Sequence, residues 1–275
     1  MEIYFINDIH INDYIPTSTG FSNIAKYKKF LEENTLPADI LCIAGDISHD
    51  VVGEVNTLIA ASKLFEKVIY INGNSELICI GEESNINSIE KLEKIAKFVK
   101  TKTKSKQVIR LDGDTVFHGG ISFTGTMGMP DATYGMNKHK GVTNWDAQSS
   151  FNEGSYRKWK WWTNDFFQLS EHENDKVMNL DCNSDIIMTH YAPLSLVNPD
   201  KHPHIDDMFL TYDSKDFIKK IMDNAIYHYG HIHTKDKRII KNKNGQFLLI
   251  NNSIGRKKDK MKTKKFIKSD FLIKL

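Results

Sequence analysis

The chain has 275 residues, 40% hydrophobic and 26% charged, so it can bury a full core and lies near the upper size of one domain. Its 37 Lys and Arg nearly balance its 35 Asp and Glu; the formal net charge of +2 does not indicate a nucleic-acid or membrane partner. No segment approaches the roughly 18 apolar residues of a membrane helix, and no secretory signal is visible. We therefore expect a soluble, cytoplasmic α/β protein; no oligomeric state is indicated.

Short apolar runs alternate with amphipathic runs along the chain, which predicts strand–helix–strand units. The first amphipathic run places Ile24, Tyr27 and Leu31 on one face, with Ser22 as its expected cap. In chain order, we predict a strand at Ile3–Ile6, a helix at Ser22–Asn34, a strand at Ile40–Ile43, a helix at Glu54–Glu66, a strand at Val68–Ile71, a helix at Ile89–Lys100, strands at Val108–Leu111 and Ile186–Met188, a helix at Asp216–Met222, and strands at Ala225–Tyr229 and Phe247–Ile250.

Two segments do not fit this alternation, although we expect one domain over residues 1–275. Residues 125–167 mix Gly, Met and Asn with Trp159, Trp161 and Trp162, and we interpret them as an insertion that these tryptophans pack. Base stacking is the alternative role for the tryptophans. The run Arg256–Lys265 carries seven basic residues; we expect a solvated surface, with phosphate or nucleic-acid binding as the alternative.

Five of the predicted strands end in side chains that bind cations. These side chains are Asp8 with His10, Asp46, Asn74, His190, and His231 with His233. In open α/β sheets the carboxyl ends of the strands form the crevice where ligands bind. We therefore expect the seven side chains to meet, although each one alone would more often be a turn, a cap or a structural residue.

The composition of this group indicates a metal centre. Imidazoles combined with carboxylates suit zinc, manganese or iron. Seven ligands are too many for one ion that keeps positions open for water and substrate. They suit two ions about 3.5–4 Å apart, which can clamp the attacking and leaving oxygens of an in-line displacement.

The order of the motifs resembles that of a known family. DIH, GDISHD, GNSE, THYAP and GHIH are similar, in sequence order, to the five signature blocks of calcineurin-like metallophosphoesterases. The resemblance extends from residue 8 to residue 233, and the NNSIG turn downstream also fits. It implies an α/β fold of the metallophosphoesterase type, a β-sandwich in which two mixed sheets pack face to face and are flanked by helices.

The resemblance also implies roles for individual residues. Asp8, His10 and His233 would hold a first divalent ion, Asp46 would bridge, and Asn74, His190 and His231 would hold the second. We expect manganese, with iron, zinc, nickel and magnesium as alternatives. A hydroxide bridging the ions would attack the phosphorus of a small phosphomonoester or phosphodiester. His49 and Glu76 are expected to lie behind the ligands.

One position departs from the family pattern. The third block should read Gly-Asn-His, but Ser75 stands where that histidine would protonate the leaving group. A hydroxyl is a poor acid at neutral pH, and general acid catalysis is worth about 10²–10⁴-fold. Three explanations stay open for Ser75. The first is an active enzyme that prefers diesters or activated leaving groups or uses another proton donor, for which His49, His139, His202 and His204 are the candidates. The others are a metal-binding pseudoenzyme and a deliberately introduced inactivating substitution.

Two functions of other classes stay open. A metal-binding interaction module without catalysis would bind metal and show no turnover. A metal-dependent nuclease would need a basic groove, which Lys100–Lys106 and Arg256–Lys265 could supply, and its binding would weaken steeply with salt. Of the remaining histidines, His118 is expected to be a packed strand residue. Substrate specificity is expected in the insertion and in the loop at His202–Asp207.

Overall fold

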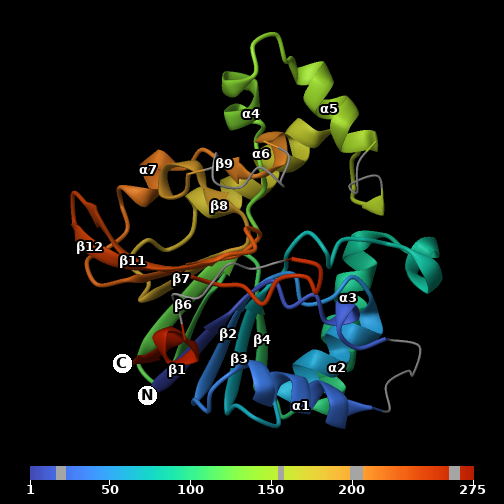
Figure 1. The fold of residues 1–275 in the computed structure, drawn as a ribbon, viewed down its shortest axis with the longest axis vertical. Coiled ribbons are helices and arrows are strands. Elements are labelled where there is room, and N and C mark those ends of the chain that lie inside the picture. The colour runs from blue at the N-terminus through green and yellow to red at the C-terminus, as the bar shows by residue number, and fades with distance from the viewer. Residues whose placement is uncertain (17–22, 154–157, 199–206, 260–266) are drawn as a thin grey trace.

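The computed structural model describes residues 1–16, 23–153, 158–198, 207–259 and 267–275. Two large mixed β-sheets lie against each other (Figure 1). Helices α1, α2 and α3 cover the outer side of the first sheet, while α6 and α7 lie beyond the second. The predicted fold class is therefore confirmed. Within the described ranges, no helix is long and apolar enough to cross a membrane.

The first sheet has five strands in the order β13-β1-β2-β3-β4. Their bounds are Leu272–Lys274, Glu2–Ile6, Ile40–Ala44, Lys67–Ile71 and Val108–Leu111. β1 to β4 are parallel and almost wholly apolar, as expected for strands covered on both faces. Helices connect them: α1 (Ile24–Asn34), α2 (Val51–Ala61) and α3 (Ser88–Lys102). All four parallel strands therefore end at the same edge of this sheet.

The second sheet has six strands in the order β11-β12-β10-β7-β6-β5. Their bounds are Lys235–Asn242, Gly245–Asn252, Ile226–Tyr229, Ile186–Thr189, Ile121–Thr126 and Thr115–His118. β12, β10, β7 and β6 are parallel, and the two edge strands are antiparallel. The sheets join where Asn7 pairs with Ser253, directly after β1 and β12. This junction brings the ends of β1, β2, β7 and β10 together.

The seven predicted strands are all present, but two helices differ from prediction. The helix predicted at Glu54–Glu66 begins earlier, because the Asp50 side chain caps it by accepting the Gly53 N–H at 2.6 Å. α7 is shorter than predicted, at Lys215–Ile218. The cap expected at Ser22 lies outside the described residues, and Asn23 precedes α1.

Six strands were not predicted: β5, β6, β11 and β13, and the short pair β8 (Ala192–Pro193) and β9 (Thr211–Tyr212). β11 is charged and lies at an edge, so it lacks the apolar pattern of a buried strand. The predicted start of the insertion falls inside β6. Residues 133–153 form α4 (Thr133–Lys138) and α5 (Asn144–Glu153), which stand clear of the sheets in Figure 1, and α6 follows at Phe166–Met178. Trp159 packs edge-on against Phe151, as predicted.

Candidate metal centre

Tight turns after the strands carry the predicted ligands. Four of these ligands, Asp8, His10, Asp46 and His231, adopt the left-handed backbone conformation, with φ of 49°, 43°, 54° and 66°. This conformation is unfavourable for residues other than glycine and occurs preferentially at functional sites. The turns support each other, because the Asp8 N–H donates to the Gly45 carbonyl at 3.1 Å and the His10 N–H donates to the Asp46 carbonyl at 2.9 Å.

A first group consists of two carboxylates and two imidazoles. One ligand atom from each of Asp8, His10, Asp46 and His233 lies within 4.8 Å of the others. His10 Nε2 is 2.9 Å from His233 Nε2 and 3.5 Å from Asp46 Oδ2. Three of the four residues are buried, and His233 is partly exposed. Atoms this close can share a single cation.

A second group lies on the other side of Asp46. Asn74 Oδ1 is 3.0 Å from both His190 Nε2 and His231 Nδ1. His190 Nε2 is also 3.4 Å from Asp46 Oδ1. The two oxygens of Asp46 therefore face different groups, Oδ2 toward His10 and Oδ1 toward His190. The structure thus brings all seven predicted residues together around one carboxylate.

Three of the imidazoles are oriented by a second partner. His190 Nδ1 lies 2.9 Å from the Ala44 carbonyl, and His231 Nε2 lies 3.1 Å from the Phe209 carbonyl. His233 Nδ1 lies 2.5 Å from Asp259 Oδ2. Each partner is an oxygen that accepts a hydrogen bond from a protonated ring nitrogen. The opposite ring nitrogen therefore carries a free lone pair, which faces the centre of the site. That arrangement is typical of metal-binding histidines.

Burial and charge set the protonation states. Burial lowers the pKa of His10 to about 4, and burial also lowers the pKa of His231. Burial would raise the pKa of Asp46, but the His190 and His10 charges outweigh it and hold this pKa below its usual range. For His190, burial opposes protonation, yet Asp46 and Asp8 raise its pKa. Neutral His10 and His231 beside an ionised Asp46 are the forms that bind divalent cations, and a cation bound at His190 would displace a proton from that ring, so the donor set fits such ions.

Glu76 connects the turns at Asp46 and Gly73 through hydrogen bonds. Its carboxylate is fully buried and accepts the backbone N–H groups of Asp46, Ile47, Ser48 and Gly73, at 2.5–3.0 Å. Burial, followed by the charge of Asp46, raises the pKa of Glu76 to about 7. Ser75 is 2% exposed, and its backbone N–H donates to Asp46 Oδ1 at 2.8 Å. Position 75 therefore supports the Asp46 carboxylate through its main chain.

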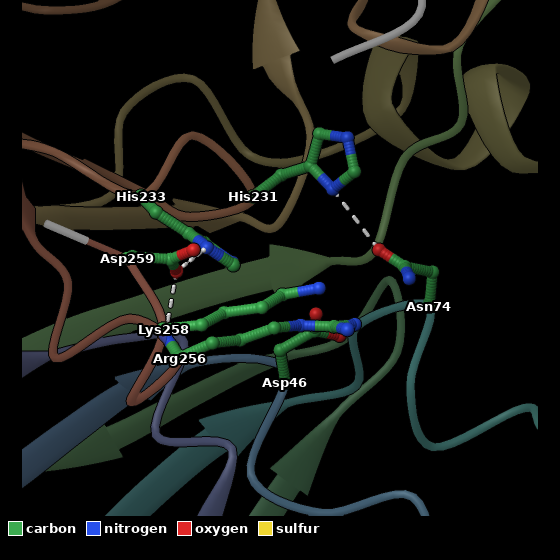
Figure 2. Close-up of a pocket in the computed structure, with 7 residues that line it drawn as sticks. All are labelled: Asp46, Asn74, His231, His233, Arg256, Lys258 and Asp259. Atoms are coloured by element: carbon green, nitrogen blue, oxygen red, sulfur yellow. Dashed lines mark hydrogen bonds and ion pairs between the residues drawn. The ribbon is translucent and has the colours of Figure 1, made fainter. Parts of the chain in front are cut away.

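A cavity of about 220 Å³ opens over the site (Figure 2). It is lined by Asp46, Asn74, His231, His233, Arg256, Lys258 and Asp259. Lys257 and Lys258 are exposed, as expected for a solvated surface at Arg256–Lys265, whereas Arg256 is half-buried in the cavity lining; residues 260–265 lie outside the described residues. Asp259 was not predicted as a site residue. The one feature of the sequence that could have indicated it is its place as a single acidic residue in a basic run soon after the NNSIG turn.

Of the other predicted histidines, those that the structure describes do not line this cavity. His49 is half-buried, with its backbone carbonyl accepting Lys91 Nζ at 2.8 Å, and burial lowers its pKa. His118 lies on β5, 3.8 Å from Glu66, as expected for a strand residue. His139 is exposed after α4. His202 and His204 lie outside the described residues.

Comparisons with known proteins identify the family and the fold. Residues 1–235 match the family model of the calcineurin-like phosphoesterases. The fold is similar to that of a phosphopantetheinyl hydrolase from Mycobacterium tuberculosis, with a TM-score of 0.61 and 16% identity over 92% of this chain and 89% of that one. A protein of unknown function from Aquifex aeolicus aligns over 70% of this chain and 79% of its own, with 14% identity and a TM-score of 0.26. No curated protein sequence matches. The chain belongs to the calcineurin-like phosphoesterase family.

Proposed function

We propose that this protein is a two-metal phosphoesterase that hydrolyses a small phosphate ester. The observation that carries the proposal is the position of Asp46, whose two oxygens face two separate ligand groups. In this proposal, Asp46 is shared, Asp8, His10 and His233 hold one ion, and Asn74, His190 and His231 hold the other. We expect manganese, with iron, zinc, nickel and magnesium as alternatives.

When bound, two divalent ions would activate a water molecule as the nucleophile and neutralise charge on the phosphoryl oxygens. The chain's own residues prepare the site for this chemistry. Asp8 and Asp46 contribute negative charge from fully or almost fully buried positions, whereas Asn74 contributes only a neutral amide oxygen. The balance with two ions present therefore stays positive, which favours an anionic ester in a cavity of low dielectric.

Ser75 limits the choice of substrate. Its side chain belongs to a residue only 2% exposed that does not line the cavity, so it cannot deliver a proton to a leaving group there. We therefore propose that the enzyme favours diesters or monoesters with good leaving groups. A Ser75→His variant should gain on aryl monoesters with poor leaving groups, and no gain would remove the basis of this preference.

The decisive experiment is turnover of a bis-aryl phosphodiester and the matching aryl phosphomonoester in Mn²⁺. Asp46→Asn should abolish turnover and reduce metal content, because one shared oxygen becomes an amide nitrogen. Asp181→Asn, in an exposed turn away from the cavity, is the matched control. Absence of turnover by a wild-type protein that holds two ions per chain would instead favour the non-catalytic metal-binding module.

A further inference from the structure

Two cationic side chains lie in the cavity beside the predicted metal ligands. Arg256 and Lys258 both line the cavity that contains Asp46 and Asn74. Figure 2 shows them extending side by side from one turn, with their charged ends between these two residues. Among the described residues, neither side chain forms a hydrogen bond or an ion pair. Two unpaired cations facing a shared cavity are a natural site for an anion.

The turn that carries these cations is firmly held. Asp259 closes it, since its Oδ2 accepts the Arg256 N–H at 2.7 Å and its N–H donates to the Arg256 carbonyl at 2.8 Å. The preceding Gly255 donates its N–H to the Asp8 carbonyl at 2.9 Å, and Tyr14 donates its hydroxyl to the Gly255 carbonyl at 2.9 Å. The cations are therefore positioned by the same backbone that positions a metal ligand.

The turn also touches the metal centre directly. Asp259 Oδ2, which accepts the Arg256 N–H, also lies 2.5 Å from His233 Nδ1. One carboxylate oxygen thus couples the orientation of His233 to the conformation of the turn. By contrast, Ser75, at the position where the family pattern has a histidine, is not among the residues that line the cavity.

We propose that Arg256 and Lys258 form a phosphate clamp, binding the phosphoryl oxygens of the substrate in the cavity beside Asp46 and Asn74. The clamp supplies the positive charge that an imidazole at position 75 would otherwise contribute. It rests on the proposed phosphoesterase function and adds the residues that recognise the phosphate. Arg offers a planar fork and Lys a point charge, and both bind phosphate.

The test is the binding of inorganic phosphate to the Mn²⁺-loaded protein, measured by titration calorimetry at fixed ionic strength. Arg256→Gln and Lys258→Gln should each weaken binding by roughly tenfold to a hundredfold, the range for hydrogen bonds to charged groups. Lys257→Gln is the matched control, because Lys257 is a neighbouring cation outside this cavity, and it should change binding less than threefold or so. Metal content should stay at the wild-type value in all three.

Turnover gives a second readout. Loss of either cation should lower kcat/KM more for the aryl monoester than for the diester, because the monoester carries one more negative charge. Phosphate binding that is absent in wild type, or unchanged in both variants, would overturn the clamp even if ester hydrolysis is intact. Loss of metal in either variant would also overturn it, since the role would then be structural. Clamp-dependent phosphate binding without any turnover would support the clamp and reject the esterase function.

Discussion

If the protein binds two metal ions as proposed, removal of the Asp259 carboxylate should weaken the site that includes His233. Asp259 Oδ2 is 2.5 Å from His233 Nδ1 and 2.7 Å from the Arg256 nitrogen. Burial would raise the pKa of Asp259, but the Arg256 N–H and His233 outweigh it and lower this pKa, so the group is a carboxylate at neutral pH. Without it, His233 loses the acceptor that directs its Nε2 toward His10, and the ring can rotate or change tautomer.

The expected size of the effect follows from the geometry. Loss of a partner that orients a metal-binding histidine costs about 10–100-fold in metal affinity, or roughly 1.4–2.8 kcal/mol. Hydrogen bonds to charged groups are worth about 1.5–3 kcal/mol, which gives a similar value. In Asp259→Ala, one Mn²⁺ equivalent should therefore bind at least tenfold more weakly. The equivalent held by Asn74, His190 and His231 should change much less. Electron paramagnetic resonance of free Mn²⁺ measures both steps.

Two comparisons make the result specific. Asp259→Asn keeps an oxygen where both N–H groups point, so it should lose less affinity than Asp259→Ala. Asp270→Ala removes a carboxylate that likewise accepts the N–H of the third residue before it, from Ile267 at 2.8 Å, but has no histidine partner. If Asp270→Ala weakened metal binding as much, or Asp259→Ala left both Mn²⁺ steps unchanged, the orienting role would be refuted.

Two further predictions test the support behind the ligands. In Gly73→Ala the new Cβ would overlap Asp46 Oδ1; overpacking of this kind costs about 1–3 kcal/mol, and metal stoichiometry should fall. The control Gly81→Ala is also strained, because Gly81 has a φ of 57°, but its Cβ meets no atom, so metal content should not change. His228 is buried with Nε2 3.1 Å from Asn7 Oδ1, and burial lowers its pKa to about 3. The fold requires the neutral form, so stability is lost as pH falls below about 6.5, by roughly 1.4 kcal/mol between pH 8 and 5.5; urea unfolding of His228→Gln should lack this loss.

The positions of the ligands could be predicted because they depend on short-range patterns. Each apolar strand ends in a turn, and Asp8, Asp46, Asn74 and His190 lie within about three residues of the ends of their strands. Parallel strands end at one edge of each sheet, so convergence within a sheet follows from topology, whereas the meeting of the two sheets depends on the Asn7–Ser253 junction. Which ligands face each other was harder to predict from the sequence. The orientation of each ring depends on a carbonyl or carboxylate far along the chain, such as the Phe209 carbonyl beside His231 Nε2.

Arg256, Lys258 and Asp259 could not be assigned from sequence for a related reason. Basic runs are usually solvated, and nothing in the composition of this run distinguishes a turn fixed to Asp8 from a free loop. The distinction comes from the Gly255 N–H bond to the Asp8 carbonyl and from the His233 contact. Both contacts connect the end of the chain to earlier segments, and no local pattern encodes them.

The replacement at position 75 is compatible with an intact centre because this position contributes its main chain to the assembly. The Ser75 N–H donates to Asp46 Oδ1, and the next residue, Glu76, accepts four N–H groups that hold the Asp46 and Gly73 turns. Any side chain that fits position 75 preserves these bonds. Serine in place of the histidine of the family pattern therefore lacks an acid–base group but keeps the main-chain bond to Asp46. Under the proposed function, the seven predicted ligands can then be retained while Arg256 and Lys258 supply positive charge over the substrate.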